Sequence, residues 1–356
     1  CRSADEIMRA DLRSCAPPPG RSQDDIDVAA TVRQLERYLD ERGILPPPEP
    51  PSAVENKVAE YGAYLRQVRG LAPSTVNHHV STASQFIAHL DDKGGLSHLP
   101  TLTAQDIESF VRRTGNRVGR GSLQHIVAQL RSFLRFLATK GEAPTGLETQ
   151  IDTPRLYRGE QLPRALPWPT VRALLDAIDR STPMGRRDYA MLLLIATYGL
   201  RTSEVVGLQF EHIEWRACRL SVPQRKTAAP LLLPLTDSVG DSLVDYLRRG
   251  RPSVPYREVF VRHRAPAGVL KPTAVTEAFQ AWSQRSRLSI PFQGPHCLRH
   301  SYAVHLLRKG TSLKTIGDVL GHRSAESTCV YLRLAVEDLR SVPLDLPSLA
   351  SQKVST

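Results

Sequence analysis

Proline-containing breaks are the feature that most limits how this chain can fold. The run at 46–51, Pro-Pro-Pro-Glu-Pro-Pro, is expected to be stiff and extended, because proline fixes φ and removes a backbone donor. The segment 144–166 contains three prolines and has no sustained hydrophobic period. These breaks predict a domain at 52–143, an interdomain linker at 144–166 and a second domain at 167–340.

The stretch 52–143 is expected to be helical throughout. Ser52 with Glu55, and Thr103 with Asp106, have the spacing of N-terminal capping boxes. Apolar residues at helical spacing follow each box, and Pro73 suits the first turn of a helix. We therefore expect a small bundle of four helices, at 53–69, 73–92, 104–113 and 122–140.

The second domain is expected to be mixed. Short runs rich in valine and leucine predict strands at 219–222, 230–235 and 259–262. Helical periods are more numerous, and they predict helices at 169–180, 186–199, 202–209, 236–249, 272–288, 296–309, 312–320 and 324–338. The fold class is therefore predicted to be mainly α with a small antiparallel β-sheet.

The two ends of the chain are expected to lie outside these domains. Residues 1–51 form an N-terminal extension: 1–23 are predicted to lack fixed structure, 24–43 to form an amphipathic helix and 44–51 to be a linker. The tail at 341–356 is apolar at intervals but too short to fold alone. It is expected either to dock on a neighbouring protomer or to be disordered.

The charge of the chain favours a polyanionic partner. The formal net charge is +11 and the pI is about 9.7, as expected for a nucleic-acid-binding protein, although solubility alone could also account for it. The five cysteines are scattered and include no C-x-x-C pair, which argues against disulfides and against a zinc site. No apolar run approaches the roughly 20 residues of a membrane span. A cytoplasmic protein is predicted.

Basic side chains in the second domain have the spacing of an anion site. Arg201 follows an apolar helix and Gly199, and Glu204 lies three residues on, where it could orient the guanidinium. His296, Arg299 and His300 are spaced i, i+3 and i+4, which places them on one helical face. A cation between two histidines makes a poor metal site, so a site for an anionic transition state is favoured.

Tyr331 becomes a candidate nucleophile only when it is considered together with these basic residues. By itself it would be interpreted as a half-buried core tyrosine, since a phenol has a pKa of about 10 and needs a base or cations to become a nucleophile. His322 follows Gly321 at a predicted corner between two helices. Lys226 lies between two predicted strands, on a hairpin from which it could reach a substrate oxygen, although a hairpin lysine more often serves solubility.

These residues as a spaced set resemble the tyrosine recombinases, or phage integrase family, over about 53–340. The resemblance is strongest from Leu298-Arg299-His300-Ser301-Tyr302 through Leu320-Gly321-His322 to Tyr331. It implies a helical, SAM-like core-binding domain followed by an α+β catalytic domain. Six positions match the family's catalytic residues, namely Arg201, Lys226, His296, Arg299, His322 and Tyr331. Around Lys226 the usual glycines are replaced by Pro223, Gln224 and Arg225.

The resemblance also implies a mechanism. Tyr331 would attack a DNA phosphate, giving a 3′-phosphotyrosine and a free 5′-hydroxyl, without metal or cofactor. The two arginines would bind the non-bridging oxygens, and His322 would donate a hydrogen bond to the phosphate. Lys226 would protonate the leaving oxygen and His296 would accept the phenolic proton. Glu204 and His300 would support these groups.

The partners implied are double-stranded DNA carrying specific sites and further copies of this chain, with a tetramer exchanging strands. Accessory proteins or partner recombinases are compatible with this. Six arginines of the helical domain are candidates for phosphate contact, although they could equally be a solvated face: Arg112, Arg113, Arg117, Arg120, Arg131 and Arg135. Integration or transposition of a mobile element is the favoured role, at the nucleoid when active. The alternatives are Xer-type resolution of chromosome or plasmid dimers, type IB topoisomerase-like relaxation, and DNA binding without cleavage.

Overall fold

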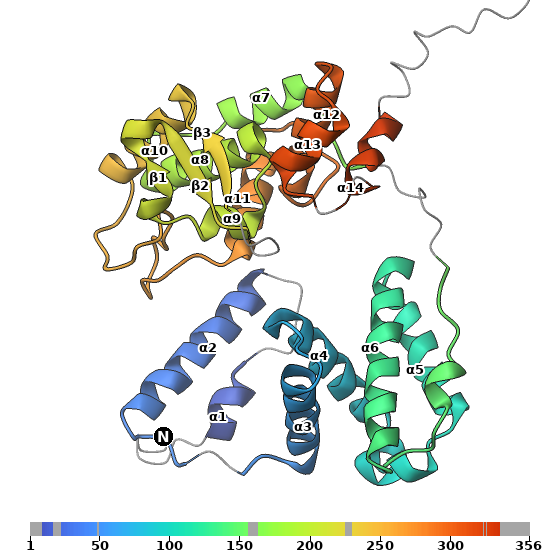
Figure 1. Ribbon diagram of the computed structural model, residues 1–356. Coiled ribbons are helices and arrows are strands. Elements are labelled where there is room, and N and C mark those ends of the chain that lie inside the picture. Colours follow the sequence, from blue (N-terminus) through green and yellow to red (C-terminus); the bar gives the residue numbers. More distant parts are fainter. Residues whose placement is uncertain are drawn as a thin grey trace, which may run out of the picture. The chain divides into compact units, whose positions relative to one another are not determined.

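The chain divides into two compact units, Cys1–Leu156 and Tyr157–Thr356. The computed structural model (Figure 1) describes residues 9–16, 23–47, 50–155, 163–224, 230–322, 324 and 326–334. Among these residues, no helix combines the length and apolar character needed to span a bilayer.

Four helices form the main part of the first unit, as predicted. Both expected capping boxes are present: Ser52 Oγ accepts from Glu55 N, and Thr103 Oγ1 accepts from Asp106 N, while each carboxylate binds the cap residue's own amide. The fourth helix begins slightly earlier than expected. The second helix ends earlier than expected, and two 3-10 turns follow it, at Asp91–Lys93 and Gly95–Thr101. The helices are α3 (Ala53–Gln67), α4 (Pro73–His89), α5 (Ala104–Gly115) and α6 (Arg120–Thr139).

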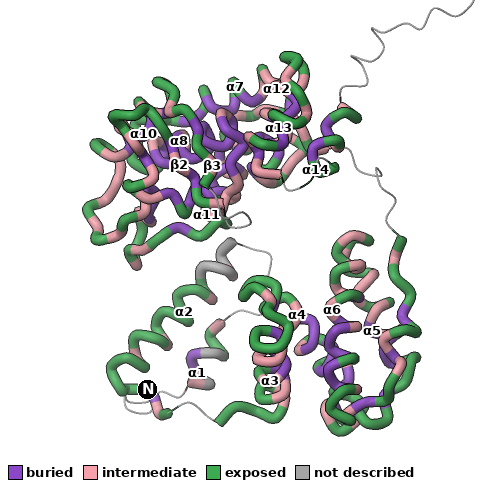
Figure 2. Tube along the Cα trace, in the orientation of Figure 1, coloured by how far each residue is buried: buried purple, intermediate pink, exposed green. Residues whose placement is uncertain are grey.

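Aromatic packing joins α3, α4, α5 and α6 into one core, which is purple in Figure 2. Tyr61 of α3 is fully buried, and its ring centroid is 5.0 Å from that of Phe133 on α6. Phe86 of α4 contacts Phe110 of α5 edge to face at 5.3 Å. Such pairs add about 0.5–1.5 kcal/mol beyond the area they bury, so the short bundle is held by a few large side chains.

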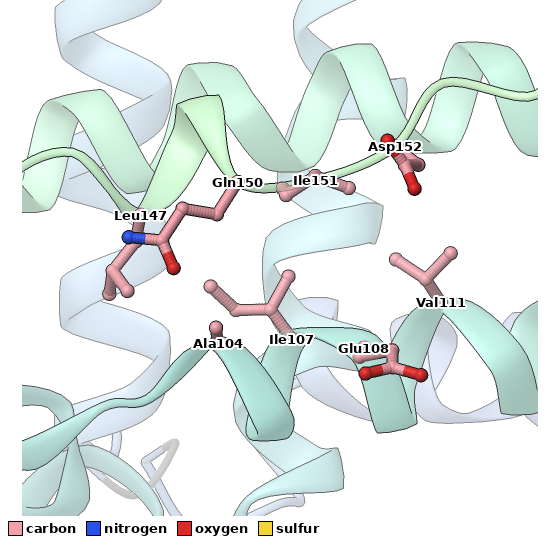
Figure 3. Close-up of a pocket in the computed structure, with 8 residues that line it drawn as sticks. All are labelled: Ala104, Ile107, Glu108, Val111, Leu147, Gln150, Ile151 and Asp152. Atoms are coloured by element: carbon pink, nitrogen blue, oxygen red, sulfur yellow. The ribbon is translucent and has the colours of Figure 1, made fainter.

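Arg131 binds the segment that follows α6. Its Nε donates to the carbonyl of Glu148 at 3.1 Å and its Nη2 to that of Ile151 at 2.5 Å. This segment includes the 3-10 turn Leu147–Thr149 and forms one wall of an open pocket of about 220 Å³ against α5. The lining residues, of which two are acidic and none is basic, are Ala104, Ile107, Glu108, Val111, Leu147, Gln150, Ile151 and Asp152 (Figure 3).

The N-terminal extension is more structured than expected. The predicted helix at 24–43 is present as α2 (Gln23–Glu41), but α1 (Arg9–Ser14) lies within residues predicted to lack fixed structure. Tertiary contacts that local sequence does not encode explain this helix. The Arg9 side chain donates to the carbonyl of Pro46 at 3.0 Å and pairs with Asp40 of α2, and Leu12 is 9% exposed.

The second unit is mainly helical, as predicted. Its helices agree with the expected ones to within a few residues, apart from a shorter α9 and the last helix. They are α7 (Trp168–Asp176), α8 (Pro183–Tyr198), α9 (Thr202–Val206), α10 (Asp237–Arg249), α11 (Pro272–Arg285), α12 (His296–Arg308) and α13 (Leu313–Leu320). α8 is buried along most of its length and packs against α7, α9, α10, α11 and α12 (Figure 2). It is therefore the central helix of this unit.

The sheet has three antiparallel strands in the order β1-β2-β3. Two are the predicted ones, β2 (Arg219–Val222) and β3 (Leu231–Pro234), paired with Leu220 opposite Leu233. The prediction at 259–262 was wrong: Val261 makes only an isolated bridge with Val269, and the third strand is β1 (Ile213–Glu214). The 259–262 run is apolar because Val259, Phe260 and Val261 are core residues, not because they join the sheet.

The predicted helix at 324–338 was also wrong in form. The described residues contain a four-residue α14 (Glu326–Cys329) followed by a 3-10 turn, η7 (Val330–Leu334). Residues 335–338 lie outside the described residues. Tyr331 is therefore on a tight turn instead of two turns into an α-helix.

Candidate active site

Gly199 ends α8 and sets the position of Arg201. It adopts φ +65°, the left-handed conformation that glycine reaches without steric cost. A Cβ there would lie 2.5 Å from Leu320 Cδ2, so the chain also passes very close to the end of α13. The chain then turns into α9, for which Arg201 is the N-cap residue.

Arg201 is held by Glu204, as the sequence predicted. The Glu204 carboxylate accepts from the Arg201 backbone amide at 2.8 Å and from Nη1 at 2.7 Å. Nη2 donates to the carbonyl of Gly321 at 3.2 Å. The carboxylate is buried, while the arginine side chain is 33% exposed, so the guanidinium is oriented from within and accessible from outside.

Arg299 lies deeper, beside Arg201. It is 3% exposed, and it donates from Nη1 to the carbonyl of Gly199 at 2.5 Å and from Nη2 to that of Leu320 at 2.6 Å. Burial, and then the charge of Arg201, lower the pKa of Arg299 to about 10. The group still carries its charge at neutral pH, so the site contains two adjacent cations.

His322 occupies the corner predicted for it. Gly321 ends α13 with φ +60°, and the His322 amide donates back to the carbonyl of Gly317 at 2.9 Å. The imidazole Nδ1 lies 2.8 Å from the hydroxyl of Thr328 on α14, which fixes the ring. Burial first, then Arg299 and Arg201, lower the pKa of His322 to about 4. The ring is therefore neutral at pH 7.

Tyr331 is buried in the same cluster. It is 2% exposed, and its hydroxyl lies 3.2 Å from Nδ1 of His300. Its ring is stacked with that of His322 at a centroid distance of 6.3 Å. Burial raises the pKa of Tyr331, an effect that Arg299 and Arg201 partly oppose. The phenol is protonated and needs a base.

The imidazole that contacts this phenol is His300, whereas the family resemblance implies His296 as the proton acceptor. Both lie on α12, with ring centroids 4.5 Å apart, but the hydrogen bond among the described residues is made by His300. Burial, followed by the neighbouring His296 and Arg299, lowers the pKa of His300 to about 4. His296 is exposed at the surface. Burial of the part of its ring that packs against the protein lowers its pKa, and the charges of Arg299 and Arg201 lower it further.

The structure brings together five of the six expected catalytic positions and both supporting ones. Lys226 lies outside the described residues. Of the arginines proposed for DNA contact, five are exposed on the helical unit, whereas Arg131 is partly buried and binds backbone carbonyls. Thr328, which orients His322, was not anticipated, because a threonine six residues beyond a histidine carries no recognisable signal.

The chemistry of this cluster suits an anion. Two guanidinium groups and neutral imidazoles lie in the same cluster as the phenol, and the Glu204 carboxylate is hydrogen-bonded to Arg201. In the part of the chain that the structure describes, no group of three or more histidine, cysteine or acidic residues is arranged to hold a metal ion. The geometry can therefore offer a nucleophile, a proton acceptor and bidentate cationic donors to one phosphoryl group.

Comparison with known families gives two matches along the chain. Residues 166–338 match the model described as the phage integrase family. Residues 58–141 match the model of the phage integrase N-terminal SAM-like domain. The two matches fall within the second and first compact units, respectively.

Curated relatives are similar over most of the chain. A Sinorhizobium fredii (strain NBRC 101917 / NGR234) protein named as integrase/recombinase y4rA is 36% identical over 301 residues, covering 84% of this chain and 73% of that protein. Tyrosine recombinase XerD of Listeria monocytogenes is 29% identical over 292 residues, covering 80% of this chain and 96% of XerD.

Solved structures share the fold. XerH bound to its difH substrate after cleavage superposes with a TM-score of 0.62 at 14% identity, covering 95% of this chain and 94% of XerH. A lambda integrase dimer bound to a core site superposes with a TM-score of 0.59 at 19% identity, covering 83% of this chain and 99% of that one.

Proposed function

Because the chain belongs to the phage integrase family and is thus a tyrosine recombinase, a DNA strand-exchange enzyme, we propose that Tyr331 is its nucleophile. The observation that carries this proposal is the hydrogen-bond distance of 3.2 Å between the Tyr331 hydroxyl and His300, next to the paired Arg201 and Arg299. A buried tyrosine is usually a core residue, but the hydroxyl of Tyr331 lies beside a neutral imidazole, next to two guanidinium groups.

In the proposed cleavage step, Tyr331 Oη attacks phosphorus. The new bond is P–Oη, the bond that breaks is P–O5′, and the product is a 3′-phosphotyrosine with a free 5′-hydroxyl. His300, which is neutral at pH 7 and lies within hydrogen-bond distance of the phenol, is placed to take the phenolic proton. Arg201, Arg299 and His322 stabilise the charge on the non-bridging oxygens. His296 stands beside them as a further phosphate donor.

The leaving 5′ oxygen needs a proton, and Lys226 remains our candidate for the donor. The support comes from the sequence alone. Lys226 follows β2 in the chain, and its match to the family's lysine position does not depend on where the arginines, histidines and Tyr331 lie. Rejoining reverses the step, with a 5′-hydroxyl from a second duplex attacking the phosphotyrosine. The cycle conserves bond energy and requires neither nucleotide nor metal.

The proposed partner is duplex DNA carrying specific sites, held by both units. Exposed arginines of the helical unit, Arg112, Arg113, Arg117, Arg120 and Arg135, are candidate phosphate contacts, and binding should weaken steeply with salt. The named relatives are bacterial, so we place the protein with the DNA in the cytoplasm.

Exchange of strands between two duplexes requires four copies of the chain in this proposal. The tail at 341–356 lies outside the described residues, and from its sequence we assign it to docking on a neighbouring protomer. Deleting 342–356 should abolish pairing of two DNA sites in a native gel while leaving binding to a single site within about threefold. Unchanged pairing would remove the tail from assembly.

For the biological role we favour integration or transposition of a mobile element, in line with the integrase/recombinase name of the Sinorhizobium relative. Dimer resolution is the second candidate, because the match to XerD extends over 96% of that protein. Mapping covalent adducts on DNA flanking the gene distinguishes them: element ends would support the first, and a chromosomal or plasmid resolution site the second.

The test of the chemistry uses a nicked duplex that traps the covalent intermediate. Wild-type protein should form an adduct stable to SDS, and Tyr331→Phe should bind the duplex equally well and form none. Residual adduct in that variant would exclude Tyr331. A two-site exchange assay then separates recombination from topoisomerase-like relaxation, and binding without any adduct from the wild type would indicate a protein that no longer cleaves.

A further inference from the structure

Gln224 packs directly against Gly321, at the corner between α13 and His322. The residue follows β2, and its side chain reaches across to a position 97 residues later in the chain. A Cβ built on Gly321 would lie 2.2 Å from Oε1 of Gln224 and 2.7 Å from both its Cδ and its Nε2. The carboxamide therefore fills the space that a side chain at 321 would take.

This contact places Gln224 within the candidate active site. The carbonyl of Gly321 accepts from Nη2 of Arg201 at 3.2 Å, and the next residue is His322. The carboxamide thus touches the residue that connects an arginine to a histidine of the site. In the sequence, Gln224 is distinguished only as one of the residues that replace the usual glycines around Lys226.

Within the described part of the chain, the amide nitrogen of Gln224 is a buried donor without a hydrogen-bond partner. Nε2 has almost no accessible surface, and no hydrogen bond to it occurs among the described residues. Buried polar groups are nearly always paired, so an exception at a cationic site calls for an explanation. The residue as a whole is only partly buried, so a rotation of the carboxamide that turns Nε2 toward a bound acceptor would remove the penalty.

We propose that Gln224 is a further phosphate-contacting residue, whose Nε2 donates to a non-bridging oxygen of the DNA phosphate that Tyr331 attacks. The inference rests on the proposed function, which supplies the anion at this corner. A neutral carboxamide donor bound to an anionic oxygen makes a charge-assisted hydrogen bond. It adds a contact without adding a third positive charge beside Arg201 and Arg299.

The experiment compares Gln224→Met, which keeps the length of the side chain but removes the donor, with Gln224→Glu, which adds a negative charge. Gln224→Met should form the covalent adduct about 10- to 100-fold more slowly than wild type, the loss expected for one hydrogen bond to a charged group. Gln224→Glu should be slower still. Gln284→Glu, at an exposed glutamine of α11, is the matched charge control and should cleave at the wild-type rate.

A modified duplex shows whether the contact is to the phosphate itself. In a Tyr331→Phe background, affinity is measured for the native duplex and for one whose scissile phosphate is a neutral methylphosphonate. Gln224→Glu should weaken binding at least tenfold on the native duplex and less than threefold on the methylphosphonate. Thermal unfolding of each variant should stay close to that of wild type.

Two results would overturn the contact. One is a folded Gln224→Met protein that cleaves within twofold of wild type. The other is a Gln224→Glu penalty of equal size on both duplexes, which would make the residue a packing element. Absence of any adduct from the wild type is a different outcome, because it would overturn the proposed function first and this contact with it.

Discussion

Arg201 and Arg299 donate hydrogen bonds to consecutive carbonyl oxygens at the C-terminal end of α13. Arg299 binds Leu320 at 2.6 Å, and Arg201 binds Gly321 at 3.2 Å. A helix C-terminus carries partial negative charge, which stabilises nearby cations. This arrangement offsets the repulsion between the two guanidinium groups. The cation pair is therefore assembled before any phosphate arrives.

Conservative lysine substitutions at these two arginines should have different effects on stability. Arg299→Lys replaces two nitrogens, each bound to a different carbonyl, with a single one, so one buried acceptor is expected to lose its partner, at a cost of about 1–3 kcal/mol in the free energy of unfolding. The Arg201 side chain is partly exposed, and a lysine at this position can still pair with Glu204. Arg201→Lys should therefore lower the free energy of unfolding by less than about 1 kcal/mol. Urea unfolding of the two proteins measures the difference.

Both lysine variants should nevertheless lose cleavage to a similar degree. A lysine cannot present the planar fork that binds two phosphate oxygens, and the loss of one such donor typically lowers a rate about 100- to 1000-fold. Adduct formation on the nicked duplex measures this. Equal stability of the two variants would contradict the separate structural role assigned to Arg299.

His300 and His296 should differ in their effect on the rate. His300→Ala removes the group hydrogen-bonded to the Tyr331 hydroxyl and should slow adduct formation about 100-fold or more, the usual contribution of a positioned base. His296→Ala should have a smaller effect, of about tenfold. In His300→Ala the rate should keep rising with pH, because burial raises the pKa of the Tyr331 phenol, which must then ionise unaided. A larger loss in His296→Ala would return the role of base to His296.

The second unit should become less stable as the pH falls below neutral. The pKa of both His300 and His322 is lowered to about 4 in the folded protein, mainly by burial, compared with about 6.5 in an unfolded chain. Between these values the unfolded chain binds protons that the folded chain does not, so the free energy of unfolding decreases as the pH drops from about 6.5 toward about 4.

Urea titrations at pH 7.5, 6 and 5 test this pH dependence. A protein carrying His300→Asn and His322→Asn should show a flatter dependence than wild type, whatever its stability at pH 7.5. His125→Asn, at an exposed histidine of α6, is the control and should leave the slope unchanged. An undiminished slope in the double variant would assign the acid sensitivity to other groups.

Local signals in the sequence predicted most of the helices of both units and part of the framework of the site. Ser52 and Gly321 were recognisable as a helix start and a helix end because capping and left-handed glycine depend on neighbouring residues alone. Strand β1 was missed because two residues carry no period, and Tyr331 was placed on a helix instead of a 3-10 turn. The helical spacing places His296 and His300 on one face of α12, but it cannot show which of the two contacts the phenol. That choice depends on the position of Tyr331, 31 residues after His300.

Gly199 illustrates how backbone conformation and close packing act together at this site. An added Cβ would meet Leu320 Cδ2 at 2.5 Å and Tyr302 Cδ1 at 3.0 Å, and the residue has φ +65°. Gly199→Ala should therefore cost about 1–2 kcal/mol for the left-handed backbone and a further roughly 1–3 kcal/mol for overpacking. Because the Gly199 carbonyl binds Arg299, cleavage should fall as well.

Two other glycines of the same unit separate these contributions. Gly310 has φ +80° with nothing within 4 Å of an added Cβ, so Gly310→Ala should show the backbone cost alone. Gly268 has neither a left-handed φ nor a close neighbour, and Gly268→Ala should be neutral or slightly stabilising, because alanine restricts the unfolded chain. Urea unfolding should rank the three as Gly199→Ala least stable, then Gly310→Ala, then Gly268→Ala. If Gly199→Ala were no less stable than Gly310→Ala, the end of α13 would have room to move away, and Arg299 would not hold the ends of α8 and α13 rigidly together.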